Sequence, residues 1–141
     1  ECVPLVRFRT RDHVVVWTDG CPCGRSGGRL RCVGRTDDML ILRGVNVFPT
    51  QIEEQLMTVA GLAPHFQIEL SKPDRMDQMR VLCECVDATV DDAARQTAAQ
   101  QLAAQIKETV GISVMIDVGD VNTITRSEGK AVRIIDNRPK G

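Results

Sequence analysis

The sequence is poor in aromatic residues and in net charge. It has no tyrosine, one tryptophan and three phenylalanines, and its formal net charge at neutral pH is −1. Nucleic-acid-binding proteins usually present a basic surface, and those that bind single strands add aromatic rings that stack on the bases. This composition therefore argues against a nucleic-acid partner.

Long apolar segments are missing as well. No run reaches the roughly 18 consecutive apolar residues of a membrane-spanning helix, so we predict no membrane association. The N-terminus carries Glu1, Arg7, Arg9, Arg11 and Asp12 where a signal peptide would have its apolar core. Because the chain begins without Met and within an expected strand, we expect it to be a piece of a longer protein.

Length and composition are ordinary for a soluble globular protein. The 141 residues suffice for one domain, or for a small domain with part of another attached. The six cysteines, at positions 2, 21, 23, 32, 83 and 85, are not spaced like a disulfide framework. Cys83 and Cys85 fall on one face of an expected strand, where they would serve as small hydrophobic residues. We therefore predict a reducing, cytoplasmic compartment.

The first third of the chain has the pattern of β structure. Strands are expected at Val3–Phe8, Val14–Trp17 and Leu30–Val33, and the segment Thr18–Gly28 between the last two has turn and loop composition. These strands lack an extended apolar period. We therefore expect them to complete a sheet or barrel whose other strands lie upstream.

After residue 50 the apolar periodicity predicts an α+β fold. A short helix with one apolar face is followed by two alternating strands, a long amphipathic helix that ends at Gly111, and a third alternating strand. The expected elements are a helix over Ile52–Val59, strands over His65–Leu70 and Met79–Cys85, a helix over Asp92–Val110 and a strand over Ile112–Val118. This order predicts a small sandwich, with helices on one face of a three-stranded antiparallel or mixed sheet.

The stretch Gly34–Glu53 is the most specific part of the sequence. It predicts a β-hairpin that turns at Arg43-Gly44, followed by a helix that starts at Pro49, with Thr50 and Glu53 at the spacing of a capping box. Local structure does not require Gly34-Arg35 ahead of the adjacent Asp37-Asp38. This group of fixed charges beside a turn is a candidate ligand-facing or hinge element.

Cys21 and Cys23 have two interpretations. Two thiolates in a tight loop would supply half of a tetrahedral zinc site, with Zn–S bonds of about 2.3 Å, although the usual spacing is C-x₂₋₄-C. Cys32 and His13 are the nearby candidates for the remaining ligands. The alternative is a loop that simply carries two unpaired cysteines.

Four ordered motifs together resemble the acyl-adenylate-forming enzymes. They are RTRD at Arg9–Asp12, CPCGR at Cys21–Arg25, GRTDDMLILRGVNVFPTQIEE at Gly34–Glu54 and RSEGKAVRIIDNR at Arg126–Arg138. The match is close for the phenylacetate–coenzyme A ligase branch, and it extends from about residue 3 to the end. The resemblance implies that residues 1–36 are the terminal β segment of a large N-terminal adenylation domain, and that residues 37–141 form a mobile C-terminal domain.

The resemblance also implies roles at the domain junction. Asp12 matches the carboxylate that accepts hydrogen bonds from the ribose hydroxyls of ATP. Arg35 matches the arginine that contacts the ribose or phosphates, and Asp37 matches the hinge about which the C-terminal domain rotates. The local alternatives are a turn-capping Asp12 and a surface Arg35 paired with Asp37 or Asp38.

Two further roles lie on loops. Arg43-Gly44 matches the turn that faces the active site during thioester formation, where glycine lets the backbone approach the pantetheine arm of coenzyme A. Lys130 matches the lysine that enters the active site for adenylation and offsets the charge developing at the α-phosphate. Its alternative is an ordinary exposed lysine.

These features predict part of an AMP-forming acid–CoA ligase. With ATP, Mg²⁺ and coenzyme A, the whole enzyme would activate an aryl or arylacetic acid, such as phenylacetate, as acyl-AMP and then form the thioester. The chain alone is expected to be inactive, because it lacks a Gly/Ser/Thr-rich phosphate loop and needs the rest of the adenylation domain as its partner. Two alternatives are a non-catalytic small-ligand-binding or dimerisation module and a zinc-stabilised structural module. The sequence is also compatible with a homodimer.

Overall fold

The computed structural model describes residues 7, 9–126 and 132–139, in which pairs of strands are separated by helical segments. They are β1 (Asp12–Trp17), β2 (Arg29–Arg35), the 3₁₀ turn η1 (Thr36–Asp38), β3 (Leu40–Leu42), β4 (Val45–Val47), α1 (Pro49–Leu56), β5 (Leu62–Ser71), β6 (Gln78–Cys85), α2 (Asp92–Val110), β7 (Met115–Gly119) and β8 (Ile134–Asp136). The expected strand Val3–Phe8 lies, apart from Arg7, outside the described residues.

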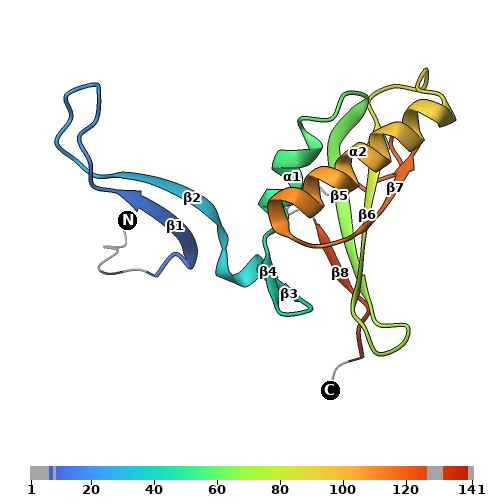
Figure 1. Ribbon diagram of the computed structural model, residues 1–141, viewed down its shortest axis with the longest axis horizontal. Coiled ribbons are helices and arrows are strands. Elements are labelled where there is room, and N and C mark those ends of the chain that lie inside the picture. Colours follow the sequence, from blue (N-terminus) through green and yellow to red (C-terminus); the bar gives the residue numbers. More distant parts are fainter. Residues whose placement is uncertain (1–6, 8, 127–131, 140–141) are drawn as a thin grey trace, which may run out of the picture.

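A mixed sheet with two helices forms the body of the molecule, residues 39–126 and 132–139 (Figure 1). Its strand order is β7-β6-β5-β8, in which β5 and β6 are antiparallel, β7 is parallel to β6, and β8 is parallel to β5. The alternating residues Phe66, Ile68 and Leu70 of β5 face the core together with Leu102 and Ile106 of α2. The predicted α+β fold, with helices on one face of a mixed sheet, is confirmed.

The sheet has one strand more than the sequence predicts. Ile134 and Ile135 form β8 with Asp136, and Ile134 pairs with Ile68 of β5. A strand of three residues is too short to show an alternating pattern. Its partner strand lies far away in the sequence, so only the folded chain reveals the pairing.

The buried cysteines behave as hydrophobic residues, as predicted. Cys83 and Cys85 have 1% and 0% exposure, and Cys83 belongs to the main core cluster. Burial raises the pKa of the Cys83 thiol to about 12. Both side chains therefore fill buried space as small hydrophobic residues.

The start of α1 differs from the predicted capping box. The helix is capped at Phe48, whose N–H donates to Oε1 of Gln51 at 3.0 Å. The Thr50 hydroxyl instead donates to the carbonyl oxygen of Val33 in β2 at 2.6 Å. The predicted Thr50–Glu53 pair is wrong because the helix begins two residues earlier than that pairing requires, and Thr50 connects the helix to β2.

The β1–β2 hairpin extends away from the body (Figure 1). Its apolar side chains stay open to solvent, with Val16 at 58% and Leu30 at 69% exposure. The hairpin is antiparallel, and its register places Asp12 opposite Arg35. This register brings two of the predicted functional residues to the end of the hairpin that joins the body.

Within the described part of the chain, neither helix combines the length and apolar character that crossing a membrane would need.

Candidate functional site

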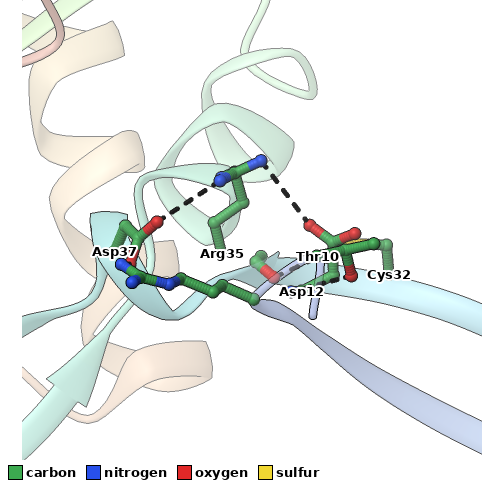
Figure 2. A network of polar contacts seen from close by, with 7 residues as sticks. Thr10, Asp12, Cys32, Arg35 and Asp37 are labelled. Atoms are coloured by element: carbon green, nitrogen blue, oxygen red, sulfur yellow. Dashed lines mark hydrogen bonds and ion pairs between the residues drawn. The ribbon is translucent and has the colours of Figure 1, made fainter. Parts of the chain in front are cut away.

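Charged residues from two separate motifs meet where the hairpin joins the body (Figure 2). Arg35 ends β2 and points one nitrogen toward Oδ2 of Asp37 at 3.3 Å and another toward Oδ1 of Asp12 at 4.0 Å. Arg11 donates to the other oxygen of Asp37 at 3.0 Å. We call Arg11, Asp12, Arg35 and Asp37 the junction cluster. The structure thus brings Asp12, Arg35 and Asp37 together.

The electrostatics of the cluster favour an ionised Asp37. The hydrogen bond from Arg11 is the main factor that lowers the pKa of this carboxyl. Burial opposes it, and Arg35 lowers the pKa further. All the partners are substantially exposed, with the Arg11 side chain at 68%. Exposed pairs are weakened by water and salt. The ion pairs of the cluster therefore orient its side chains but add little to the stability of the junction.

Asp37 lies in a short turn between two extended residues. Arg35 precedes η1 with φ −104° and ψ 139°, and Met39 follows it with φ −69° and ψ 126°. The N–H of Thr36 donates to the Arg11 carbonyl oxygen at 2.8 Å. Hinge rotations typically occur in short turns of this kind, which lie between the end of one strand and the start of the next.

Phe48 forms a packing contact across the junction that the sequence analysis missed. The His13 ring stacks on it with centroids 5.5 Å apart, and a Cβ added to Gly34 would lie 2.6 Å from its Cδ1 atom. Glycine at position 34 is therefore required by close approach. Because β2 itself contains no aromatic residue, its sequence does not indicate that a ring packs against Gly34.

A cavity of about 380 Å³ opens beside the junction cluster. It lies between the end of β2, the start of α1 and the residues that lead into β8. Its lining includes Cys32, Arg35, Thr50, Val132 and Arg133. Because both sides of the proposed hinge contribute to the wall, any rotation there would reshape this cavity.

The Arg43-Gly44 turn connects β3 and β4 as predicted. Arg43 has φ 50° and Gly44 has φ 82°, both in the left-handed region that two-residue hairpins favour. Arg43 donates to the carbonyl oxygen of Ser113 at 2.9 Å. Its side chain thus binds the α2–β7 connection, separate from the junction cluster.

Lys130 lies outside the described residues, but the residues on either side of its segment have defined partners. Arg126 pairs with Glu84, and Arg133 donates to both carboxylate oxygens of Glu53 at 2.7 Å. The sequence analysis did not single out Glu84, and it named Glu53 only as a helix-capping residue. A buried glutamate in a strand and a glutamate on a helix carry no recognisable signal until their arginine partners are known.

Cys21 and Cys23 lie close together in their loop, with sulfur atoms 2.8 Å apart. Their hydrogen bond lowers the pKa of the Cys23 thiol. The other candidates point elsewhere, because Cys32 contacts the Gly34 carbonyl oxygen and His13 stacks on Phe48. In the described segments, no three His, Cys, Asp or Glu side chains gather as a metal site. The described residues therefore supply no further ligands beside Cys21 and Cys23, and the zinc site stays a prediction.

Fold and sequence together define the class of this protein. Residues 44–138 match a family model described as the AMP-binding enzyme C-terminal domain, and the chain belongs to this family. The resemblance to acyl-adenylate-forming enzymes is thereby confirmed. The match begins after residue 37, so the boundary between residues 36 and 37 stays a prediction.

Among individual proteins, the chain is similar to phenylacetate–coenzyme A ligases. It is 39% identical to the enzyme of Escherichia coli K12 over 140 residues, which is 98% of this chain and 32% of that protein. The chain thus spans about a third of the length of the curated relatives it matches. The crystal structure of a phenylacetate–coenzyme A ligase domain from Bacteroides vulgatus is 31% identical, with a TM-score of 0.67 over 74% of this chain and 97% of that one.

A second enzyme has been solved in several states, two of which differ in their likeness to this chain. 2-Hydroxyisobutyryl-CoA ligase is 28% identical in both alignments, and 29% of its length is covered. Its postadenylation structure gives a TM-score of 0.81 over 95% of this chain. Its thioesterification structure gives 0.67 over 96%.

Proposed function

We propose that this chain is the junction and C-terminal part of an AMP-forming acid–CoA ligase that activates an aryl or arylacetic acid such as phenylacetate. Family membership and the identity to phenylacetate–coenzyme A ligases support the reaction class. The observation that carries the proposal is the junction cluster. Asp12 and Arg35, which the nucleotide would contact, lie beside Asp37 in the covalent link between hairpin and body.

The first half-reaction joins the acid to AMP and releases pyrophosphate. Asp12 would accept hydrogen bonds from the ribose hydroxyls, since a carboxylate presents two acceptor oxygens to a diol. Arg35 would turn from its weak, exposed contacts toward the ribose or phosphates. Lys130 would offset the negative charge that builds up as the carboxylate attacks the α-phosphorus.

The second half-reaction uses a different face of the body. Residues 37–141 would rotate about Asp37 relative to residues 1–36, and the Arg43-Gly44 turn would then approach the pantetheine arm. A Cβ at Gly44 would meet nothing within 4 Å, so the outer side of this turn is open to a partner. The thiol would attack the acyl carbonyl carbon, and AMP would leave. The difference in TM-score between the two states of 2-hydroxyisobutyryl-CoA ligase supports such a rearrangement.

Metal ions enter the proposal only through the substrate. Mg²⁺ would accompany ATP, but the described residues offer no group of three ligands for it or for zinc. We therefore assign no metal ligand in this chain and derive no step through a metal. The cytoplasmic location and the homodimer remain predictions, which fractionation and light scattering would test.

The test is acid-dependent exchange of pyrophosphate into ATP by the full-length protein over a panel of aryl and arylacetic acids. We expect exchange with at least one acid, and a loss of about 100-fold or more on Lys130→Ala, typical of removing a group that stabilises developing charge. The 141-residue chain alone should show no exchange. Absence of exchange with every acid, combined with retained binding of one, would favour the non-catalytic module.

A further inference from the structure

The guanidinium of Arg138 joins three separate segments of the body. It forms a bidentate pair with Asp136, in which Nε donates to Oδ1 at 2.9 Å and Nη2 donates to Oδ2 at 2.7 Å. Its remaining nitrogen, Nη1, donates to Oδ2 of Asp77 at 3.1 Å and to the carbonyl oxygen of Ile41 at 3.0 Å. The chain after β8, the loop between β5 and β6, and the hairpin of β3 and β4 therefore meet at one side chain.

The position of Arg138 is itself well defined. Asp136 pairs with Leu70 in the register of β8 and β5, and the N–H of Asn137 donates to the Leu70 carbonyl oxygen at 2.9 Å. The bidentate pair with Asp136 then fixes the plane of the guanidinium. Arg138 thus extends from the edge strand of the sheet in a single orientation.

This group of charges is partly shielded from water. The side chains of Arg138 and Asp77 have 24% and 21% exposure, whereas those of the Arg80–Asp117 pair have 48% and 53%. The hydrogen bond to Asp136 is the main factor that raises the pKa of Arg138; burial opposes it, and the bond to Asp77 raises the pKa further. Charge-assisted hydrogen bonds gain strength where less water competes for them. Arg138 is therefore held more firmly than an exposed pair would hold it.

The Ile41 carbonyl belongs to the hairpin that carries the Arg43-Gly44 turn. β3 and β4 form a two-stranded sheet, in which Ile41 lies opposite Asn46. Alternate residues of such a ladder direct their backbone groups away from the partner strand. Arg138 binds one of these groups, at a position two residues before Arg43. Its contact thus restrains the strand that leads directly into the turn.

A second arginine attaches the turn itself. Arg43 donates to the carbonyl oxygen of Ser113 in the α2–β7 connection at 2.9 Å. Arg43 would release this bond if its side chain turned toward coenzyme A. The contact from Arg138 reaches the backbone of the hairpin and can persist when that happens. Arg138 would then keep the hairpin in place while the turn binds its ligand.

We infer that Arg138, held by Asp136 and Asp77, is a positioning residue for thioester formation, acting through the Ile41 carbonyl on the hairpin that carries the Arg43-Gly44 turn. This inference rests on the proposed function. Arg138 is not a catalytic residue, since its guanidinium is bound to partners within the body. A displacement of the turn by about 1 Å would cost on the order of 100-fold in rate. The loss should fall on thioester formation and spare adenylation.

The experiment measures both half-reactions in the full-length protein for wild type and Arg138→Gln. Pyrophosphate exchange measures adenylation, and thioester formation from supplied acyl-AMP and saturating coenzyme A measures the second step. We expect kcat for thioester formation to fall by about 10- to 100-fold, with pyrophosphate exchange within about twofold of wild type. Amide hydrogen exchange of residues 40–47 should accelerate. Arg138→Lys should recover only part of the rate, because one ammonium cannot reproduce the planar, bidentate contacts.

Arg80→Gln provides the matched control. Arg80 pairs with Asp117 at 3.4 Å, and this exposed pair connects β6 with β7. Both half-reactions and the hydrogen exchange of residues 40–47 should be unchanged. Should Arg138→Gln fail to fold in a thermal melt, Asp77→Asn carries the test. It keeps the shape of the side chain and weakens one bond to Nη1, so thioester formation alone should fall by about three- to tenfold.

The outcomes separate the two proposals. Equal losses in both half-reactions, or unchanged thioester formation in the folded variants, would overturn the positioning role and leave the ligase function standing. Slower thioester formation without faster hydrogen exchange in residues 40–47 would overturn it too, because the effect would not pass through the hairpin. Wild-type protein without acid-dependent pyrophosphate exchange would overturn the proposed function, and the inference with it.

Discussion

The hairpin and the body of this molecule are built on opposite principles. The body buries the side chains of two helices against a four-stranded sheet, whereas the hairpin exposes nearly every side chain, including Val16 and Trp17. A two-stranded ribbon is marginal in water by itself. The body can therefore hold its own shape, whereas the hairpin has the form of an edge that another sheet would cover.

The candidate functional residues divide along the same line. Asp12 and Arg35 belong to the exposed hairpin, and the Arg43-Gly44 turn belongs to the packed body. Between them Asp37 takes part in exposed ion pairs. A site assembled across a boundary of unequal stability can be rearranged there without disturbing either half.

The largest expected effect lies in the core of the body. Leu102 is completely buried between α2 and the sheet, so Leu102→Ala should lower the free energy of unfolding by about 2–5 kcal/mol. Urea denaturation of the 141-residue chain measures this loss. Val16→Ala in the hairpin is the control and should change stability by less than about 0.5 kcal/mol. Similar losses from both would contradict the contrast between the two regions.

The second prediction concerns the close packing at the junction. Gly34→Ala would place a Cβ 2.6 Å from the Phe48 ring, and overpacking of this kind costs about 1–3 kcal/mol. Ring-current shifts of His13 should change as the Phe48 ring moves. Gly27→Ala, where a Cβ meets nothing within 4 Å, is the matched control. If both glycines tolerate alanine equally, the approach of β2 to Phe48 is looser than described.

A smaller effect is expected at the hydrogen bond that connects the two regions. Thr50→Val keeps the shape of the side chain but removes the bond to the Val33 carbonyl oxygen, which is worth about 0.5–1.5 kcal/mol. Hydrogen exchange should accelerate in β2 and stay unchanged in β6. Faster exchange throughout the body would mean that Thr50 supports the domain and not the junction.

How far the sequence predicted the molecule depends on the range of the interactions. Alternation along Phe66–Leu70 and the four-residue spacing to Leu102 and Ile106 predicted the strands and helix correctly, because these patterns are local. The pairing of β8 with β5 and the Glu84–Arg126 contact join distant segments. The spacing of apolar residues does not indicate which distant segment a strand or side chain will contact.

The candidate site shows the same division. Motif resemblance identified Asp12, Arg35 and Asp37, and the structure places them together. The contacts around them were not predictable. In the sequence Phe48 is an ordinary apolar residue, although its ring stacks on His13. Thr50 has the spacing of a helix cap, although its hydroxyl donates to the Val33 carbonyl oxygen in β2. Such residues acquire their roles from the approach of the hairpin to the body.

The smallest expected effect is a change in the titration of Asp37. Because its pKa is lowered in the folded chain, its ion pairs are fully present above the ordinary pKa of an aspartate, about 3.9, and are lost as the pH falls through the lower folded value. Arg11→Gln removes the main cause, so the pKa should rise toward the ordinary value in an NMR titration. Asp87, whose pKa is lowered by Thr89, should not respond. An unchanged Asp37 would mean that Arg35 alone sets its charge, and the junction would then depend on a single exposed arginine.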